Sequence, residues 1–479
     1  MSVVGGRTAA VRRAVRAGVS GMPRDFWWLW ASTLVNRLGA FVSTFLVLYL
    51  TNEKGHSAAY AGLVVSLYGL GGIVSSLAGG VMADRLGRRP TLLIAQSSTA
   101  VSVAVLGFVQ HPVAIAAVAC VVGAATTASR PAVQAMMADI VPPEDRVRAF
   151  ALNYWAINLG FAISAVAAGF IAEYSYLIGF LGEAVMTMAC AILIFIKLPE
   201  SRPERTADDG AGAAAEAEVS LRTVLRDGRF MGVVGLSFLI ALVFMQGHTG
   251  VPLAMGADGM SPADFGLVMA LNGLLIVVLQ IPITHLIEHR DPRRLLVVSS
   301  LLVGYGFGLT AFAGSIGFYA LTVLVWTLAE IVNAPTQTGL VVRLSPVHGR
   351  GRYQGVFSVT WPVATLIAPL MAGTMIDRLG EQWLWATCAV LGTVAGLGYW
   401  LLMRNLPAAE PVRGKDEPVR GKDEPVRGKD DPARGKDDPG RSNDEPVPAT
   451  VPAPVLAAPV PAAVEPQPTD AVVQQKSTA

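Results

Sequence analysis

Two ionisable side chains, Arg37 and Glu330, lie deep inside apolar runs that are long enough to cross a membrane. An ionisable group in hydrocarbon is unfavourable, so by default it marks a path for substrate, ions or protons. Helical rise places Arg37 about 16 Å after the start of its run and Glu330 about 16 Å before the end of its run, and these two ends lie on the same side of the membrane. We therefore expect a guanidinium and a carboxylate at one depth, attracting each other until Glu330 is protonated or a charged substrate enters. A structural ion pair without a role in coupling is the alternative.

Three further ionisable residues have competing explanations. Glu183 lies near one end of its apolar run, where it could be interfacial instead of a coupling group. Arg130 lies late in another run, where its long side chain could snorkel to the membrane surface. His248 could be a proton carrier or a residue of a water-filled vestibule.

Uncharged candidates are of two kinds. Amide side chains inside the apolar runs could hydrogen-bond a substrate or join helices, and these are Asn36, Asn158, Gln246 and Asn272. Indole rings could wall a cavity for lipophilic cargo or simply pack between helices, and these are Trp155, Trp326 and Trp361.

The apolar runs that carry these residues dominate the chain. Of 479 residues, 53% are hydrophobic and 15% are charged, and the mean hydropathy is +0.50. Each run has about 20 to 27 residues, enough to cross a ~30 Å hydrocarbon core as a helix. The twelve runs are 26–50, 58–82, 90–109, 112–137, 149–172, 177–197, 230–254, 263–287, 294–313, 315–341, 353–375 and 382–403. The sequence therefore predicts an all-α membrane protein with twelve transmembrane helices.

Positive charge alternates along the turns between these runs. Basic turns such as the one with Arg88 and Arg89 alternate with turns nearly free of Lys and Arg, and residues 1–25 form a basic leader. The positive-inside rule then predicts that both termini lie in the cytoplasm and that the protein is multi-pass in the cell membrane.

The two halves of the chain repeat. Ser57, Gly62 and Pro131 recur as Ser261, Gly266 and Pro335, each 204 positions later, and charged turn residues agree at the same offset. This predicts two six-helix bundles in a parallel pseudo-twofold repeat, at 26–198 and 229–404, joined by a cytoplasmic linker at 199–228. Transporters built this way bind substrate near the midplane between the halves.

Beyond residue 404 the composition changes. Residues 411–445 contain five tandem heptads, but a Pro and a Gly in each repeat exclude a helix. We expect 405–479 to be a disordered cytoplasmic tail.

The turn after the second run carries the most specific motif. It reads Gly80-Val-Met-Ala-Asp84-Arg85-Leu-Gly87-Arg88-Arg89, with Gly87 suited to a sharp reversal and Pro90 to the first turn of the next helix. This resembles the loop between helices two and three of the major facilitator superfamily. The resemblance implies the fold of that superfamily, with spans one, four, seven and ten around a central cavity. It also implies a gate in which Asp84, with Arg88 and Arg89, meets the start of span eleven near 351–353.

One stretch departs from the resembled family. Proton-driven exporters usually carry a Gly-Pro kink in span five, and residues 160–169 lack it while keeping their small side chains. The sequence therefore favours export less strongly than it favours membership of the superfamily.

The preferred function is proton-coupled export of a lipophilic drug or metabolite, which could be cationic, as in multidrug members. Proton-coupled uptake, for example of peptides, is one alternative, because residues 36–41 faintly resemble peptide symporters. A polytopic membrane enzyme or sensor is another, although no phosphate-binding, nucleophile or metal-ligand pattern supports one. We expect no enzyme activity, cofactor or metal, and no nucleic-acid binding. Small-molecule substrate, protons and lipid are the expected partners of a monomer.

Overall fold

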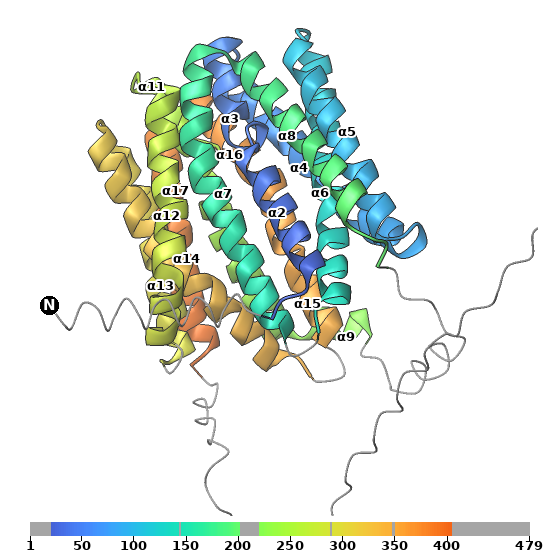
Figure 1. Cartoon of the computed structure of the whole chain (residues 1–479). Helices are drawn as coiled ribbons and strands as arrows, with labels where there is room; N and C mark the ends of the chain where they lie inside the picture. The colour runs from blue at the N-terminus through green and yellow to red at the C-terminus, as the bar shows by residue number, and fades with distance from the viewer. Residues whose placement is uncertain (1–20, 143–144, 202–219, 288–289, 347–349, 405–479) are drawn as a thin grey trace, which may run out of the picture. The chain divides into compact units, whose positions relative to one another are not determined.

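The computed structural model describes residues 21–142, 145–201, 220–287, 290–346 and 350–404. The predicted tail, most of the leader and most of the linker lie outside these residues. In the described part every regular element is helical, and twelve helical segments are long and apolar enough to cross a membrane. The prediction of a twelve-helix all-α membrane protein is therefore confirmed. Figure 1 shows these helices side by side along one common direction.

The first half of the chain supplies six spans. Their elements are α2 (Arg24–Leu38), α3 (Val42–Leu48), η1 (Tyr49–Glu53), α4 (Ala58–Arg85), α5 (Arg88–Phe108), α6 (Pro112–Ile140), α7 (Arg146–Tyr174) and α8 (Tyr176–Lys197). Several helices extend a few residues beyond the apolar runs, because their last turn is polar and lies past the predicted hydrocarbon boundary.

The second half supplies the other six spans. A short helix, α9 (Leu221–Arg226), precedes them. The elements that follow are α10 (Gly228–Phe244), η4 (Met245–Gly247), α11 (Gly250–Ala257), α12 (Pro262–Ile287), α13 (Pro292–Gly308), η5 (Leu309–Phe312), α14 (Ile316–Leu344), α15 (Arg350–Ser358), α16 (Thr360–Leu379) and α17 (Glu381–Leu402).

The end of the predicted polar linker is structured. Val224 of α9 is fully buried and packs in one apolar cluster with Phe230 and Tyr353. Tyr353 also donates a hydrogen bond from its hydroxyl to Asp227 over 3.1 Å. The end of the predicted linker thus contains a short helix, and one apolar side chain anchors this turn on the helices that follow.

The first and seventh spans are interrupted at equivalent positions. The first breaks between Leu38 and Val42, and the seventh changes from α10 to η4 at Met245. Adding the repeat offset of 204 to Phe41 gives 245, so the second interruption falls where the repeat places it. An uninterrupted helix satisfies its own backbone groups, so each break needs other partners.

The turn between α4 and α5 has the expected geometry. Gly87 has φ +106°, a conformation that disfavours residues with a Cβ, and Pro90 lies in the first turn of α5. Arg85 is the last residue of α4, and Arg88 and Arg89 open α5.

The two halves touch at one end of the spans. We call the end that carries Gly87 the loop face and the opposite end the far face. At the far face the two halves touch through α4 against α16 and α7 against α12. Asp377 accepts hydrogen bonds from the backbone N–H groups of Ala58 (3.2 Å) and Ala59 (2.7 Å). These bonds tie α16 to the start of α4.

Glycines let the backbones approach closely along this far-face seam. A Cβ on Gly62 would overlap the carbonyl oxygen of Pro369, and one on Gly266 would overlap that of Ala165. The close approaches of α4 continue to Gly69 and those of α12 to Gly273, near the middle of each helix. The halves are therefore packed together over the far half of the membrane.

Candidate functional site

A cavity of about 270 Å³ lies between the two halves near mid-membrane. Its polar lining comes from Arg37, Ser43, Tyr68, Arg130, His248, Thr249 and Thr365. The apolar lining includes Leu46 and Val65 from the first half and Met245 and Pro369 from the second. Arg37 is 13 residues from the start of α2, or roughly 20 Å along the helix. The cavity thus has the place expected for a substrate site between two repeats.

Both interrupted spans border this cavity. Val42 and Ser43 line it just after the break in the first span, and His248 and Thr249 line it just after η4 in the seventh. Broken helices at membrane depth occur where they line a cavity or are covered by protein. The two breaks therefore belong to the site.

Glu183 satisfies the break in the first span. Its Oε2 accepts hydrogen bonds from the N–H groups of Phe41 (3.0 Å) and Val42 (2.7 Å), the first donors of α3. The side chain is on α8 and only 8% of the residue is exposed. Glu183 is thus a buried cap inside the first half, placed by contacts more than 140 positions apart in sequence.

Arg37 and Arg130 form the charged part of the cavity wall. They are close enough to interact electrostatically with each other, and Glu183 and Tyr68 are also within electrostatic reach of Arg37. Within the described residues, no carboxylate lies at ion-pair distance from either guanidinium. Gly160 of α7 lets α2 pack closely against it, because a Cβ at residue 160 would overlap Cβ of Arg37.

Glu330 lies in a second polar group, on α14. Its Oε2 accepts a hydrogen bond of 3.0 Å from Asn272 Nδ2, which also donates to Thr327 at 3.0 Å. Across the seam, Tyr154 of α7 is within electrostatic reach of Glu330. Next to Asn272, Gly273 packs against the carbonyl oxygen of Asn158. Asn272 and Gly273 therefore connect the Glu330 carboxyl group to the surface where the two halves meet.

The expected pairing of Arg37 with Glu330 is absent from this conformation. Glu330 is 14 residues from the end of α14, roughly 21 Å, so helical rise does give both residues a similar depth. In the described part of the chain they form no ion pair, and each has different neighbours. Depth follows from counting residues, whereas the direction of a side chain around its helix depends on tertiary packing.

The other predicted polar residues occupy separate places. Asn36 donates to Gln96 Oε1 at 3.1 Å, and Asn158 donates to the carbonyl oxygen of Tyr154 at 2.9 Å. Gln246 is fully buried and donates to the carbonyl oxygens of Leu242 and Ala368, while its own Oε1 has no hydrogen-bond partner. In this state Asn36 and Asn158 bond within the first half, and Gln246 packs in the second.

The three tryptophans divide into two sorts. Trp326 is only 4% exposed and stacks on Phe307 with ring centroids 5.1 Å apart, so it packs in the core. Trp155 and Trp361 are each 39% exposed. They stack on Trp30 and Phe244 at 6.5 and 6.0 Å respectively.

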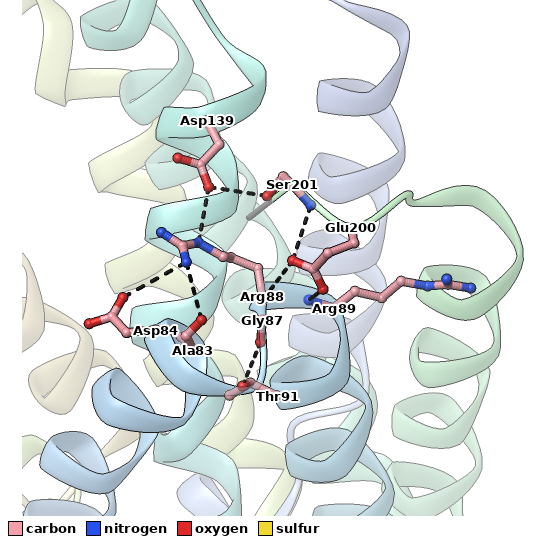
Figure 2. A network of polar contacts seen from close by, with 9 residues as sticks. All are labelled: Ala83, Asp84, Gly87, Arg88, Arg89, Thr91, Asp139, Glu200 and Ser201. Atoms are coloured by element: carbon pink, nitrogen blue, oxygen red, sulfur yellow. Dashed lines mark hydrogen bonds and ion pairs between the residues drawn. The ribbon is translucent and has the colours of Figure 1, made fainter. Parts of the chain in front are cut away.

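The predicted loop motif forms a compact polar network at the loop face (Figure 2). Arg88 Nε donates to Asp139 Oδ2 of α6 over 3.0 Å, and Arg88 Nη1 lies 3.8 Å from Asp84. The Asp84 side chain is 75% exposed, whereas the Arg88 side chain is 13% exposed. Asp139 is thus the main partner of Arg88 here, and Asp84 stays largely in solvent.

A second carboxylate caps α5 within the same network. Glu200 accepts hydrogen bonds from the N–H groups of Arg88 (2.8 Å) and Arg89 (3.1 Å), where a carboxylate also meets the positive end of the helix dipole. A Cβ on Gly87 would collide with this carboxylate. In contrast, a Cβ on Gly80 would meet no atom within 4 Å. The network therefore requires a glycine at 87 and not at 80.

Sequence reasoning missed Asp139, Glu200 and Tyr68. Asp139 follows the fourth run and Glu200 follows the sixth, so both read as ordinary polar turn residues. The available signal was their location at the same membrane face as three arginines, since opposite charges at one surface tend to pair. Tyr68 gave no signal beyond a polar group in an apolar helix.

Comparison with known proteins agrees with this architecture. A family model described as Major Facilitator Superfamily matches residues 29–256 and 249–459. The uncharacterised MFS-type transporter YqjV of Bacillus subtilis is 23% identical over 74% of this chain and 87% of its own length. The multidrug resistance protein MdtH of Salmonella arizonae is 22% identical, with coverage of 77% and 92%. A Na⁺, Li⁺, K⁺/H⁺ antiporter of Planococcus maritimus is 24% identical, with coverage of 74% and 89%.

Solved structures share the fold. A POT family transporter in complex with a thioalcohol-conjugated peptide has a TM-score of 0.67 and 17% identity, covering 81% of this chain and 97% of that one. A D-xylose–proton symporter has a TM-score of 0.65 and 17% identity, covering 78% and 95%. The chain belongs to the Major Facilitator Superfamily. It is accordingly a multi-pass membrane protein of a family of transporters, and the recognition made from the loop motif is confirmed.

Proposed function

We propose that the protein is a secondary active transporter that exports a lipophilic small molecule in exchange for protons by alternating access. The observation that carries this proposal is the mid-membrane cavity lined by both halves and bordered by both helix breaks. Because both halves supply its lining, a rocking motion that opens the loop face or the far face would expose the same site to either side.

In this proposal the loop face lies on the cytoplasmic side of the cell membrane. The arginines of the Gly87 turn, with Arg146 and Arg148 at the start of α7, lie at this face. With the far half packed and Asp84 exposed, the conformation corresponds to one that faces the cytoplasm. Asp84 would then gain partners at the start of the eleventh span only after the loop face closes.

Glu330 is the proposed proton carrier. Its carboxylate is held by Asn272, whose neighbour Gly273 packs on α7 at the interface of the halves. Protonation would change the charge beside that interface, and a few kcal/mol of differential stability are enough to shift a two-state equilibrium. Glu183 is a weaker carrier, because its carboxylate already receives two backbone hydrogen bonds.

Two other transport modes compete with this proposal. Uptake by proton symport would use the same cavity and differ only in that substrate and protons move in the same direction. Exchange of a monovalent metal cation, as the name of the Planococcus relative describes, is disfavoured by two guanidiniums in the wall. Within the described residues, no group of three or more His, Cys, Asp or Glu side chains could hold a metal ion.

The test uses everted membrane vesicles acidified by respiration, with acridine orange reporting the pH gradient. A panel of lipophilic compounds is added, and Na⁺, Li⁺ and K⁺ are separate additions. Exchange predicts dequenching with at least one lipophilic compound, no response to the three cations, and loss of the response in Glu330→Gln. Vesicles without the protein are the control. Dequenching by cations alone, or an unchanged response in Glu330→Gln, would contradict the proposal.

A further inference from the structure

We propose that the central cavity binds an organic anion, a carboxylate joined to an apolar body, through Arg37 and Arg130. This rests on the proposed function for the place of the site and adds the chemical class of its ligand. It departs from the expectation that a lipophilic cargo could be a cation.

The charge of the cavity wall is the first argument. Arg37 on α2 and Arg130 on α6 both line the cavity and lie within electrostatic range of each other, and two positive charges in one cavity wall favour an anion between them. Guanidinium groups also match a carboxylate geometrically, since each can offer two parallel N–H donors.

The carboxylate nearest to Arg37 is already bonded to other groups. Glu183 is within electrostatic reach of Arg37 but uses Oε2 to accept hydrogen bonds from the N–H groups of Phe41 and Val42. It is fixed by the helix break and forms no ion pair with either arginine. The remaining ionisable lining groups, Tyr68 and His248, add no negative charge in their ordinary neutral forms.

The apolar part of the cavity lining determines the chemical character of the rest of the ligand. Beyond the arginines, most of the wall is aliphatic or aromatic, including Leu46, Val65, Phe161, Met245 and Pro369. A site with a few convergent polar groups in an apolar wall orients a ligand by its charged end and holds its body by burial. A small inorganic anion would leave this apolar surface unused.

The first experiment measures the sign of the potential without knowing the ligand. Ser43 lines the cavity and is exposed, so Ser43→Cys is introduced into the full chain with Cys120, Cys190 and Cys388 replaced. The cysteine is reacted with the anionic sulfonatoethyl methanethiosulfonate and with the cationic trimethylammonium methanethiosulfonate reagent. Each rate is divided by the rate of the same reagent with 2-mercaptoethanol, and the ratio of the anionic to the cationic value is taken. We expect a ratio favouring the anion by about tenfold, as for clefts lined by charge of one sign.

Variants separate this effect from structural damage. Arg37→Gln and Arg130→Gln should each lower the ratio, whereas Arg130→Lys should keep most of it. Arg294→Gln is the matched control, because that side chain is 88% exposed in the first turn of α13. A ratio at or below one, no reaction with either reagent, or a ratio unaffected by both glutamine variants would overturn the proposal.

The second experiment identifies the ligand class. Protection of the same cysteine is compared for 4-phenylbutanoate and its uncharged isostere 4-phenylbutanamide, in a neutral detergent without anionic lipid. Stronger protection by the carboxylate, lost in Arg130→Gln, is expected, and equal or absent protection would contradict carboxylate binding. Neither assay requires transport. A protein with the anionic preference but no proton exchange would therefore refute the exchange mechanism and leave this site standing.

Discussion

Glu183 Oε2 lies 2.7 Å from the backbone nitrogen of Val42 and holds the first turn of α3 where the first span is broken. The same oxygen accepts from Phe41 at 3.0 Å, so one side chain of α8 satisfies two backbone donors that the break leaves without helical partners. Because Val42 and Ser43 line the cavity, this contact also shapes the candidate site.

Removing that acceptor should destabilise the protein. Glu183→Ala would leave two buried N–H groups without partners, at a cost of about 1–3 kcal/mol for each unsatisfied group. Glu183→Gln keeps a carbonyl acceptor and should lose less. The measurement is thermal unfolding of the purified protein in detergent, followed by tryptophan fluorescence. Equal melting temperatures for Glu183→Ala and Glu183→Gln would show that the two hydrogen bonds are not what Glu183 contributes.

The loop network predicts unequal roles for two acidic partners of one arginine. Asp139→Asn removes the charge of a sheltered pair at 3.0 Å, and its melting temperature should fall by an amount corresponding to about 1–3 kcal/mol. Asp84→Asn removes a contact of 3.8 Å from a side chain that is 75% exposed, where ion pairs contribute about 0–1 kcal/mol. A larger loss for Asp84→Asn would mean that the solution ensemble favours a state with the loop face closed.

The far-face seam should be sensitive to a single methyl group. In Gly62→Ala the new Cβ would collide with the carbonyl oxygen of Pro369, so the seam should loosen and conformations open at the far face should gain population. Gly235→Ala is the matched control, because a Cβ there meets no atom within 4 Å.

Alkylation of a cysteine at Ala59, beside the seam, would report this change. We expect a several-fold higher rate in Gly62→Ala and an unchanged rate in Gly235→Ala. If both substitutions left the rate unchanged, the close approach of α4 and α16 would not limit opening.

The twelve spans were predictable because hydropathy over about 20 residues depends on composition alone. The Gly87 reversal was also predictable, since a local motif fixes it. The break at Phe41 was not, because the apolar run continues through it and the compensating acceptor is 142 positions away. Tertiary contacts outweigh local pattern there.

The candidate site was predictable only in part. Arg37 and Arg130 both line the cavity, but no sequence pattern gave the shared direction of their side chains. Trp326 and Gln246 show the reverse case, because their side chains turn into the core. Rotation of each helix about its axis decides both outcomes, and only packing determines that rotation.

In the proposed mechanism, the two halves rock about a cavity that faces one side of the membrane at a time. Spin-label distances test it with two pairs of exposed positions in a cysteine-replaced chain. Leu86 and Val342 mark the loop face, and Tyr174 and Ile316 mark the far face. Alternating access predicts that a change of pH, or Glu330→Gln, shortens one distance while lengthening the other. Distances that shift together, or that stay fixed under every condition, would contradict it.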